Sequence, residues 1–187
     1  MAERDPEGKR TRVVHAAATA FASHGFAGTS TAAIARDAGV SEGIVFHYFG
    51  SKHGVLEACT AADAVAFAES ELANHRNGIN YPGLVAATFE WVGANRMVRR
   101  LWAEGDDRTV GALRRGWQGG IVPAVASALE AEQREGRCRA GDSSRLARMQ
   151  FAVMGEAMVV HFNDPMHWPL EDAITDTASL LNALVAA

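Results

Sequence analysis

The chain has 187 residues, of which 48% are hydrophobic and 21% charged, with a formal net charge of −4 at pH 7. This length and composition allow a substantial core in one domain or in two small ones. The sequence contains no run of 18 or more uncharged apolar residues and no charged-then-apolar signal pattern, so we expect a cytoplasmic protein that does not span a membrane.

The first predicted helix opens with a cationic cluster that includes Lys9 and Arg10, preceded by a polar stretch that should be a mobile arm. The cluster is either a solvated group of charges or a contact to the phosphates or the minor groove of DNA. Apolar residues recur at three- and four-residue steps from Val13 to Phe21, which is typical of a helix with one apolar face. Gly25 should end this helix.

Two short helical patterns separated by a tight turn lie between Thr29 and Lys52. Ser30 and Ser41 can each cap a helix start. Gly39 can take a positive φ, so one helix can end and the next begin within about four residues, which is the spacing of a helix-turn-helix. Six apolar residues would hold the two helices together: Ile34, Ala35, Ala38, Val40, Val45 and Phe49.

The outward side of the second short helix is the side from which such motifs read the major groove of DNA. Its residues are Glu42, Gly43, Ile44, Phe46, His47 and Tyr48. Glu42 can accept a hydrogen bond from a cytosine amine, and Ile44 can contact a thymine methyl group. Thr31 and Lys52 can meet the sugar-phosphate chain.

The rest of the chain also predicts helices, because no segment alternates with a period of two over a useful length. The segment from Leu84 to Trp102 is apolar almost all round up to Met97, as in a helix inside a bundle. Pro123 should kink its helix or split it in two. The expected helices run from Lys52 to about His75, from Leu84 to Trp102, from Thr109 to Glu135, from Asp142 to Phe162 and from Pro169 to Val185.

The ordered landmarks from Val13 to Lys52 resemble the TetR family of helix-turn-helix transcriptional repressors. Beyond them the chain resembles that family in helical layout and in the turn from Glu135 to Asp142. The resemblance implies an all-α protein with a three-helix DNA-binding head in residues 1–51 and a larger effector-binding and dimerisation bundle in residues 52–187. The residues that carry it are Val13–Ala17, Phe21, Gly25, Phe26, Thr29, Ser30, Ile34, Ala35, Ala38–Ser41, Phe46–Phe49, Ser51 and Lys52.

The resemblance also implies a homodimer formed by the last two helices, which carry broad apolar faces. Alternatively, these faces only close the core of a single chain. The helix-turn-helix favours the dimer, because one short helix reads too few bases and a two-fold dimer reads two half-sites. The faces comprise Leu146, Met149, Val153, Met154, Met158 and Val159 in one helix, and Ile174, Leu180, Leu181 and Leu184 in the other.

A small-molecule pocket among the middle helices is the third implication of the resemblance. Apolar walls with a few polar groups would suit a mostly hydrophobic effector. Aromatic residues at helical spacing are also common in a plain core, so both interpretations stand. The candidate effector-binding residues are Phe67, Phe89, Trp91, Asn95, Trp102, Trp117 and His161.

We therefore predict a dimeric repressor that a small, mostly hydrophobic effector releases from a pseudo-palindromic operator in double-stranded DNA. The alternative is a helical ligand-binding or protein-interaction module that retains the head but has lost operator binding. Three departures from the family pattern support the alternative. A non-acidic residue is common where Glu42 stands, threonine where Ile44 stands and tyrosine where Phe46 stands.

Neither an enzyme nor a metal site is predicted. Cys59 and Cys138 form no C-x-x-C pair and are expected to be ordinary residues rather than a redox switch. The sequence has no G-x-S-x-G elbow and no glycine-rich phosphate loop, and its histidine pairs lack the i, i+4 step of a helical zinc site. We expect no catalytic residue, no metal and no cofactor.

Overall fold

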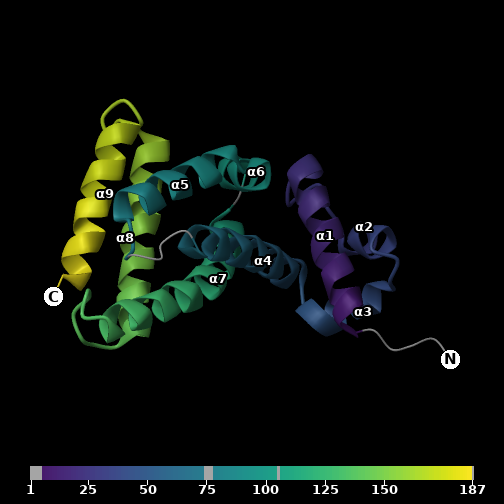
Figure 1. Cartoon of the computed structure of the whole chain (residues 1–187). Coiled ribbons are helices and arrows are strands. Elements are labelled where there is room, and N and C mark those ends of the chain that lie inside the picture. The colour runs from purple at the N-terminus through teal and green to yellow at the C-terminus, as the bar shows by residue number, and fades with distance from the viewer. Residues whose placement is uncertain (1–5, 74–77, 105, 187) are drawn as a thin grey trace. The chain divides into compact units, whose positions relative to one another are not determined.

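A computed structural model describes residues 6–73, 78–104 and 106–186. All regular structure in these ranges is helical, which confirms the all-α prediction (Figure 1). The mobile arm was predicted for residues 1–8. Residues 1–5 lie outside the described residues, and residues 6–8 are helical instead, because proline is well tolerated in the first turn of a helix. The helices are α1 (Pro6–His24), α2 (Thr31–Asp37), α3 (Glu42–Phe49), α4 (Lys52–Ala73), α5 (Tyr81–Ala94), α6 (Arg96–Glu104), α7 (Asp107–Arg134), α8 (Ser143–Asn163) and α9 (Leu170–Val185).

The chain divides into two compact units. The first, here called the head unit, contains Met1–Asp63 and Asn95–Trp117, and the second, the body unit, contains Ala64–Ala94 and Gln118–Ala187. Helices α4 and α7 each contribute residues to both units. The boundary expected after residue 51 stays a prediction.

The first three helices of the head unit close around a small apolar core. Val13 and Phe21 of α1, Ile34 of α2 and Val45 of α3 are fully buried. Gly25 ends α1 as predicted, with a φ of 72° and its N–H donating to the Phe21 carbonyl at 3.0 Å. Burying these side chains stabilises the head by roughly 1.5–3 kcal/mol each.

The predicted single helix from Leu84 to Trp102 was wrong, because the structure has two helices, α5 and α6, which meet at Asn95. The Asn95 side-chain oxygen accepts from the Val98 N–H at 3.1 Å, so Asn95 caps the start of α6. Helix α5 also begins earlier than expected, at Tyr81, because proline is well tolerated in the first turn of a helix.

Helix α7 runs unbroken through Pro123, so the expected split does not occur. A proline removes the hydrogen bond to the carbonyl four residues earlier, here that of Gly119. Both Pro123 and Gly119 are exposed, so water can satisfy that carbonyl.

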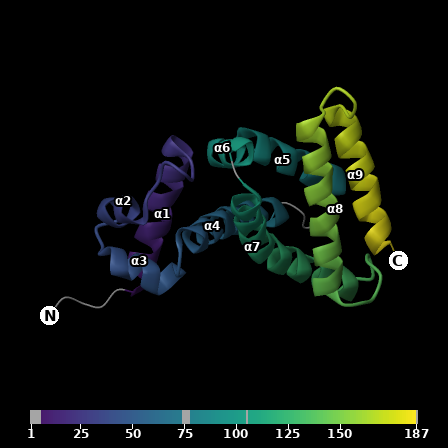
Figure 2. The same ribbon diagram turned by 180° about the vertical axis from the view of Figure 1, so that it is seen from behind.

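In the body unit, α8 and α9 lie side by side in both views (Figures 1 and 2). Asp142 caps α8 as predicted, accepting from the Arg145 N–H at 3.0 Å. A buried hydrogen bond of 2.6 Å from the Gln150 amide to the Tyr81 hydroxyl joins α8 to α5. Within the described residues, no helix is both long enough and apolar enough to span a bilayer.

Candidate functional site

Helices α2 and α3 form the predicted helix-turn-helix. The Ser30 hydroxyl oxygen accepts from the Ala33 N–H at 3.1 Å and caps α2. Gly39 takes a φ of 66°, and the Val40 N–H reaches back to the Ala35 carbonyl at 3.0 Å. This closes the last turn of α2 and lets α3 begin at residue 42, because only a residue without Cβ enters that backbone region at low cost.

The exposed side of α3 contains the residues expected to read DNA. Glu42, Gly43, Phe46 and His47 are exposed, and Ile44 is half-buried. Phe46 is 48% exposed. Tyr48 is half-buried, and its ring lies 5.2 Å from that of His47.

The start of α3 differs from the sequence prediction in one detail. Ser41 occupies the N-cap position, but its side chain makes no capping hydrogen bond. Instead, the Thr31 hydroxyl at the start of α2 donates to Glu42 Oε1 at 2.5 Å. This bond joins the first residues of the two helices, and the sequence pattern did not predict it.

Lys52, expected to meet a phosphate, makes contacts within the head. Its Nζ donates to the carbonyls of Phe26 at 2.7 Å and Thr29 at 2.8 Å, and it lies 4.3 Å from the centre of the Phe26 ring. Burial lowers the pKa of this ammonium group. Two of its three N–H donors therefore hold the loop that follows α1, which leaves one donor for a phosphate.

The cationic cluster at the start of α1 has two kinds of partner. The Arg10 guanidinium lies 5.6 Å from the centre of the Phe49 ring on α3. Arg12 donates from Nε to the Ala38 carbonyl at 3.2 Å, so it binds the C-terminal end of α2. Lys9 is half-buried. The role of Arg12 was missed, because the sequence does not show which cation meets that carbonyl.

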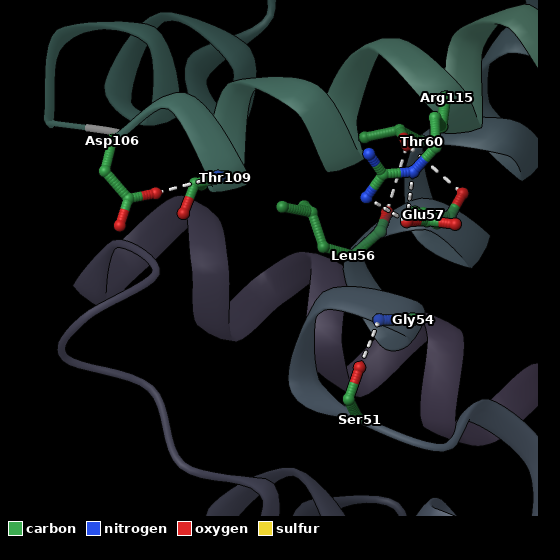
Figure 3. A network of polar contacts seen from close by, with 8 residues as sticks. All are labelled: Ser51, Gly54, Leu56, Glu57, Thr60, Asp106, Thr109 and Arg115. Carbon is green, nitrogen blue, oxygen red and sulfur yellow. Dashed lines mark hydrogen bonds and ion pairs between the residues drawn. The ribbon is translucent and has the colours of Figure 1, made fainter.

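Helices α4 and α7 make a close contact within the head unit. Arg115 of α7 and Glu57 of α4 form an ion pair of 2.5 Å (Figure 3). A Cβ at Gly116 would lie 1.8 Å from Thr60 Oγ1 and 2.5 Å from the Glu57 carbonyl oxygen. Only glycine allows this separation of the two helices.

Four of the expected effector-binding residues are in the body unit, where they make ring contacts. Phe67 and Trp91 stack with centroids 4.5 Å apart and planes at 13°. Phe89 meets His161 edge-on at 5.4 Å. The His161 Nδ1 lies 2.9 Å from the Trp168 carbonyl oxygen. These residues therefore form two separate aromatic contacts.

The other three expected effector-binding residues belong to the head unit. Trp102 and Trp117 have ring centroids 6.5 Å apart. The Asn95 amide donates to Asp63 Oδ2 at 2.7 Å, and burial raises the pKa of the Asp63 carboxyl, an effect that this hydrogen bond opposes. Asn95 and Asp63 line a cavity of about 390 Å³ together with Thr11, Val14, His15, Ala18, Cys59, Ala62 and Met97.

Comparison with known proteins gives a consistent result. The family model described as bacterial regulatory proteins, tetR family, matches residues 13–59. The HTH-type transcriptional regulator BetI of Vibrio vulnificus is 46% identical over 52 residues, which cover 28% of this chain and only 26% of BetI. The HTH-type transcriptional regulator UidR of Escherichia coli K12 is 29% identical over 136 residues, covering 68% of this chain and 67% of UidR.

Solved structures show the same fold along the chain. The structure of RolR in complex with resorcinol has a TM-score of 0.70 at 17% identity and covers 98% of this chain and 90% of RolR. A tetR-family regulator from Mesorhizobium loti has a TM-score of 0.62 at 21% identity and covers 99% and 100% of the two chains. At these identities the likeness concerns the fold alone.

Proposed function

Because the chain belongs to the TetR family and is a transcriptional regulator, we propose that it is a dimeric repressor that a small, mostly hydrophobic effector releases from its operator. The resemblance seen in the sequence is thereby confirmed. The relatives it matches are transcriptional regulators and not enzymes. The observation that carries the DNA-binding proposal is the capped helix-turn-helix, whose second helix keeps its outward side exposed.

In this proposal α3 enters the major groove of the operator. The protein would then act in the cytoplasm, because bacterial DNA lies there. Glu42, Ile44 and His47 would approach base edges, and Tyr48 would approach the backbone. Phe46 offers only apolar contact, because it lacks the hydroxyl that a tyrosine would donate to a phosphate. Further roles in DNA binding fall to Gly43, Lys9, Arg10 and the third N–H of Lys52.

The dimer proposal is supported by apolar side chains that a single chain leaves exposed on α8 and α9. Met149 is 41% exposed, Val160 43% and Leu180 57%. Val160 was not among the predicted face residues. Other members of those faces, such as Leu146 and Leu181, are buried within one chain. The buried residues close the core of a single chain, and the exposed set is the candidate dimer interface.

The effector proposal is supported by the aromatic contacts of the body unit and by the fold. RolR, which shares that fold, has been solved with resorcinol, a small aromatic compound. We propose that Phe67, Phe89, Trp91 and His161 contact a ligand of this chemical class in the body unit. Trp102, Trp117 and Asn95 belong to the head unit, and their surroundings would change when the effector binds.

Selection of bound duplexes from a random pool tests the function. We expect the wild-type chain to enrich a pseudo-palindromic site, because a two-fold dimer presents α3 twice. The double variant His47→Ala, Tyr48→Ala should bind that site at least about tenfold more weakly. Phe46→Tyr should bind all sequences about tenfold more tightly through a new phosphate contact.

One control variant and one ligand experiment complete the test. The Ser127→Ala variant changes an exposed position on α7 and should bind as the wild-type chain does. A small aromatic ligand that quenches tryptophan fluorescence should also lower DNA affinity, by about 5- to 150-fold for switches of this class. If the wild-type chain enriches no sequence, the interaction-module alternative replaces the repressor.

A further inference from the structure

The contact between the two helix starts has a consequence for base recognition. Thr31 is the first residue of α2, Glu42 is the first residue of α3, and the Thr31 hydroxyl donates to Glu42 Oε1 at 2.5 Å. Glu42 is exposed and Thr31 is half-buried, so this bond lies at the protein surface, on the outward side of α3. We propose that Thr31 is a positioning residue that fixes the Glu42 carboxylate to read one base pair.

The chemistry of the pair determines which base it can read. A carboxylate has only acceptors, and a threonine hydroxyl has a single hydrogen to donate. With Oε1 engaged by Thr31, Oε2 remains to accept from a base. In the major groove the cytosine N4 amine is a donor that glutamate accepts from, and the adenine N6 amine is a donor flanked by the N7 acceptor, which repels a carboxylate. Guanine O6 and N7 and thymine O4 are acceptors. The fixed carboxylate therefore favours cytosine and disfavours guanine and thymine at that position.

The bond also removes freedom that would blur this preference. An unrestrained glutamate side chain rotates around three single bonds, so its carboxylate could point to many places in the groove. Ser41, the other hydroxyl at this helix start, makes no side-chain capping bond. Thr31 therefore orients the Glu42 carboxylate. Its hydroxyl has a single hydrogen, which cannot be donated to a phosphate at the same time.

This inference rests on the proposed DNA-binding function, and one experiment separates the two. The selected operator is made in four versions that differ at the base pair preferred opposite Glu42, and each is titrated with four proteins. These are the wild type, Thr31→Val, Thr31→Ser and Glu42→Gln. Valine matches the shape of threonine without its donor, and serine restores the donor. Thermal unfolding of each variant shows whether the head stays folded.

We expect the wild-type chain to prefer cytosine by about tenfold. Thr31→Val should keep its affinity for the least favoured version within about twofold but lose most of the preference, and Thr31→Ser should recover it. Glu42→Gln should shift the preference toward adenine, which an amide recognises through N6 and N7.

Two outcomes would overturn the inference while leaving the function intact. A uniform loss of affinity in Thr31→Val for all four versions would mean that Thr31 binds a phosphate. An unchanged preference in Thr31→Val would mean that Glu42 needs no positioning. If the wild-type chain binds no duplex, the proposed function and this inference fail together.

Discussion

The contacts inside the head unit differ in kind from those inside the body unit. In the head unit, cationic side chains donate to backbone carbonyls of other segments: Lys52 to Phe26 and Thr29, Arg12 to Ala38 and Arg100 to Ser23. The body unit has polar contacts too, but it contains most of the large apolar side chains that are exposed among the described residues. These are Val65, Met149, Val160, Phe162, Met166, Leu170 and Leu180, against Phe46 alone in the head unit.

This difference matches two different requirements. A reading helix needs a fixed position, and a side chain that donates to a carbonyl of another segment fixes geometry at a defined distance. An exposed apolar surface needs a partner to cover it, because patches of this kind mark interaction sites. In the proposed function, the polar contacts of the head unit would hold α3 in place, and the exposed apolar side chains of α8 and α9 would be covered by a second chain.

The largest expected effect separates the core of the body unit from its surface. Leu181 is 2% exposed and its neighbour Leu180 is 57% exposed. Leu181→Glu should place an unpaired carboxylate in the core and lower the free energy of unfolding by more than about 4 kcal/mol. Chemical denaturation of the purified variant measures this loss.

Leu180→Glu is the matched variant. It should leave the unfolding of a single chain nearly unchanged and weaken dimer association by about 100-fold or more, because the charge would be buried between chains. Sedimentation velocity at micromolar concentration measures the association. A wild-type chain that sediments as a monomer would remove the dimer from the proposal.

The close contact of the head unit gives the second prediction. Gly116→Ala would push a methyl group into Thr60 and the Glu57 carbonyl, so it should destabilise the chain by about 1–3 kcal/mol. Gly119 lies three residues further along α7 with nothing within 4 Å of a Cβ. Gly119→Ala should stabilise the chain by up to about 1 kcal/mol, because alanine is the better helix former. Equal melting shifts in the two variants would contradict the close contact.

The features that the sequence predicted correctly are local. The Ser30 and Asp142 caps, the positive φ of Gly39 and the end of α1 at Gly25 each depend on residues within one turn of each other. The apolar side of α1 was predictable for the same reason, because its period is set by the helix itself.

The features that were missed depend on partners distant in the sequence. Lys52 and Thr31 donate to acceptors that only the folded chain brings near them. Lys52 donates to the carbonyls of Phe26 and Thr29, and Thr31 donates to Glu42, so these bonds compete with the expected phosphate contacts. The break at Asn95 had a local signal, since asparagine is a good N-cap, but the apolar run on both sides concealed it. The aromatic residues expected in one pocket are divided between two units, which composition cannot reveal.

The third prediction tests the polar contacts of the head unit. Lys52→Met keeps an apolar stem of similar length but loses both hydrogen bonds to the Phe26 and Thr29 carbonyls. We expect a loss of about 1–2 kcal/mol, at the low end for charged donors because the group is partly hydrated. Lys9 is the only other lysine in the chain, and Lys9→Met should change stability by less than about 0.5 kcal/mol. Equal effects would show that Lys52 serves only as a surface charge.

The smallest expected effect compares the two cysteines, one in each unit. Cys59 is 3% exposed and its thiol donates to the Val14 carbonyl at 3.3 Å, while burial raises its pKa to about 12. Burial also raises the pKa of Cys138, which is 6% exposed. At pH 8 the Cys59 thiolate fraction is then on the order of one in ten thousand, so both thiols should react far more slowly with a disulfide reagent than a free cysteine does. The variants Cys59→Ala and Cys138→Ala assign the two rates.

The raised pKa of Cys59 also makes stability depend on pH, because the thiol of the unfolded chain ionises first. The stability that it contributes is present below the usual thiol pKa of 9.0 and is lost as the pH rises toward about 12. The wild-type chain should therefore lose more stability than Cys59→Ala between pH 8 and pH 10, a difference on the order of 1 kcal/mol. Rapid labelling of Cys59 at pH 8 would show that the contact between α1 and α4 opens readily, and the head unit would then be less rigid than its hydrogen bonds imply.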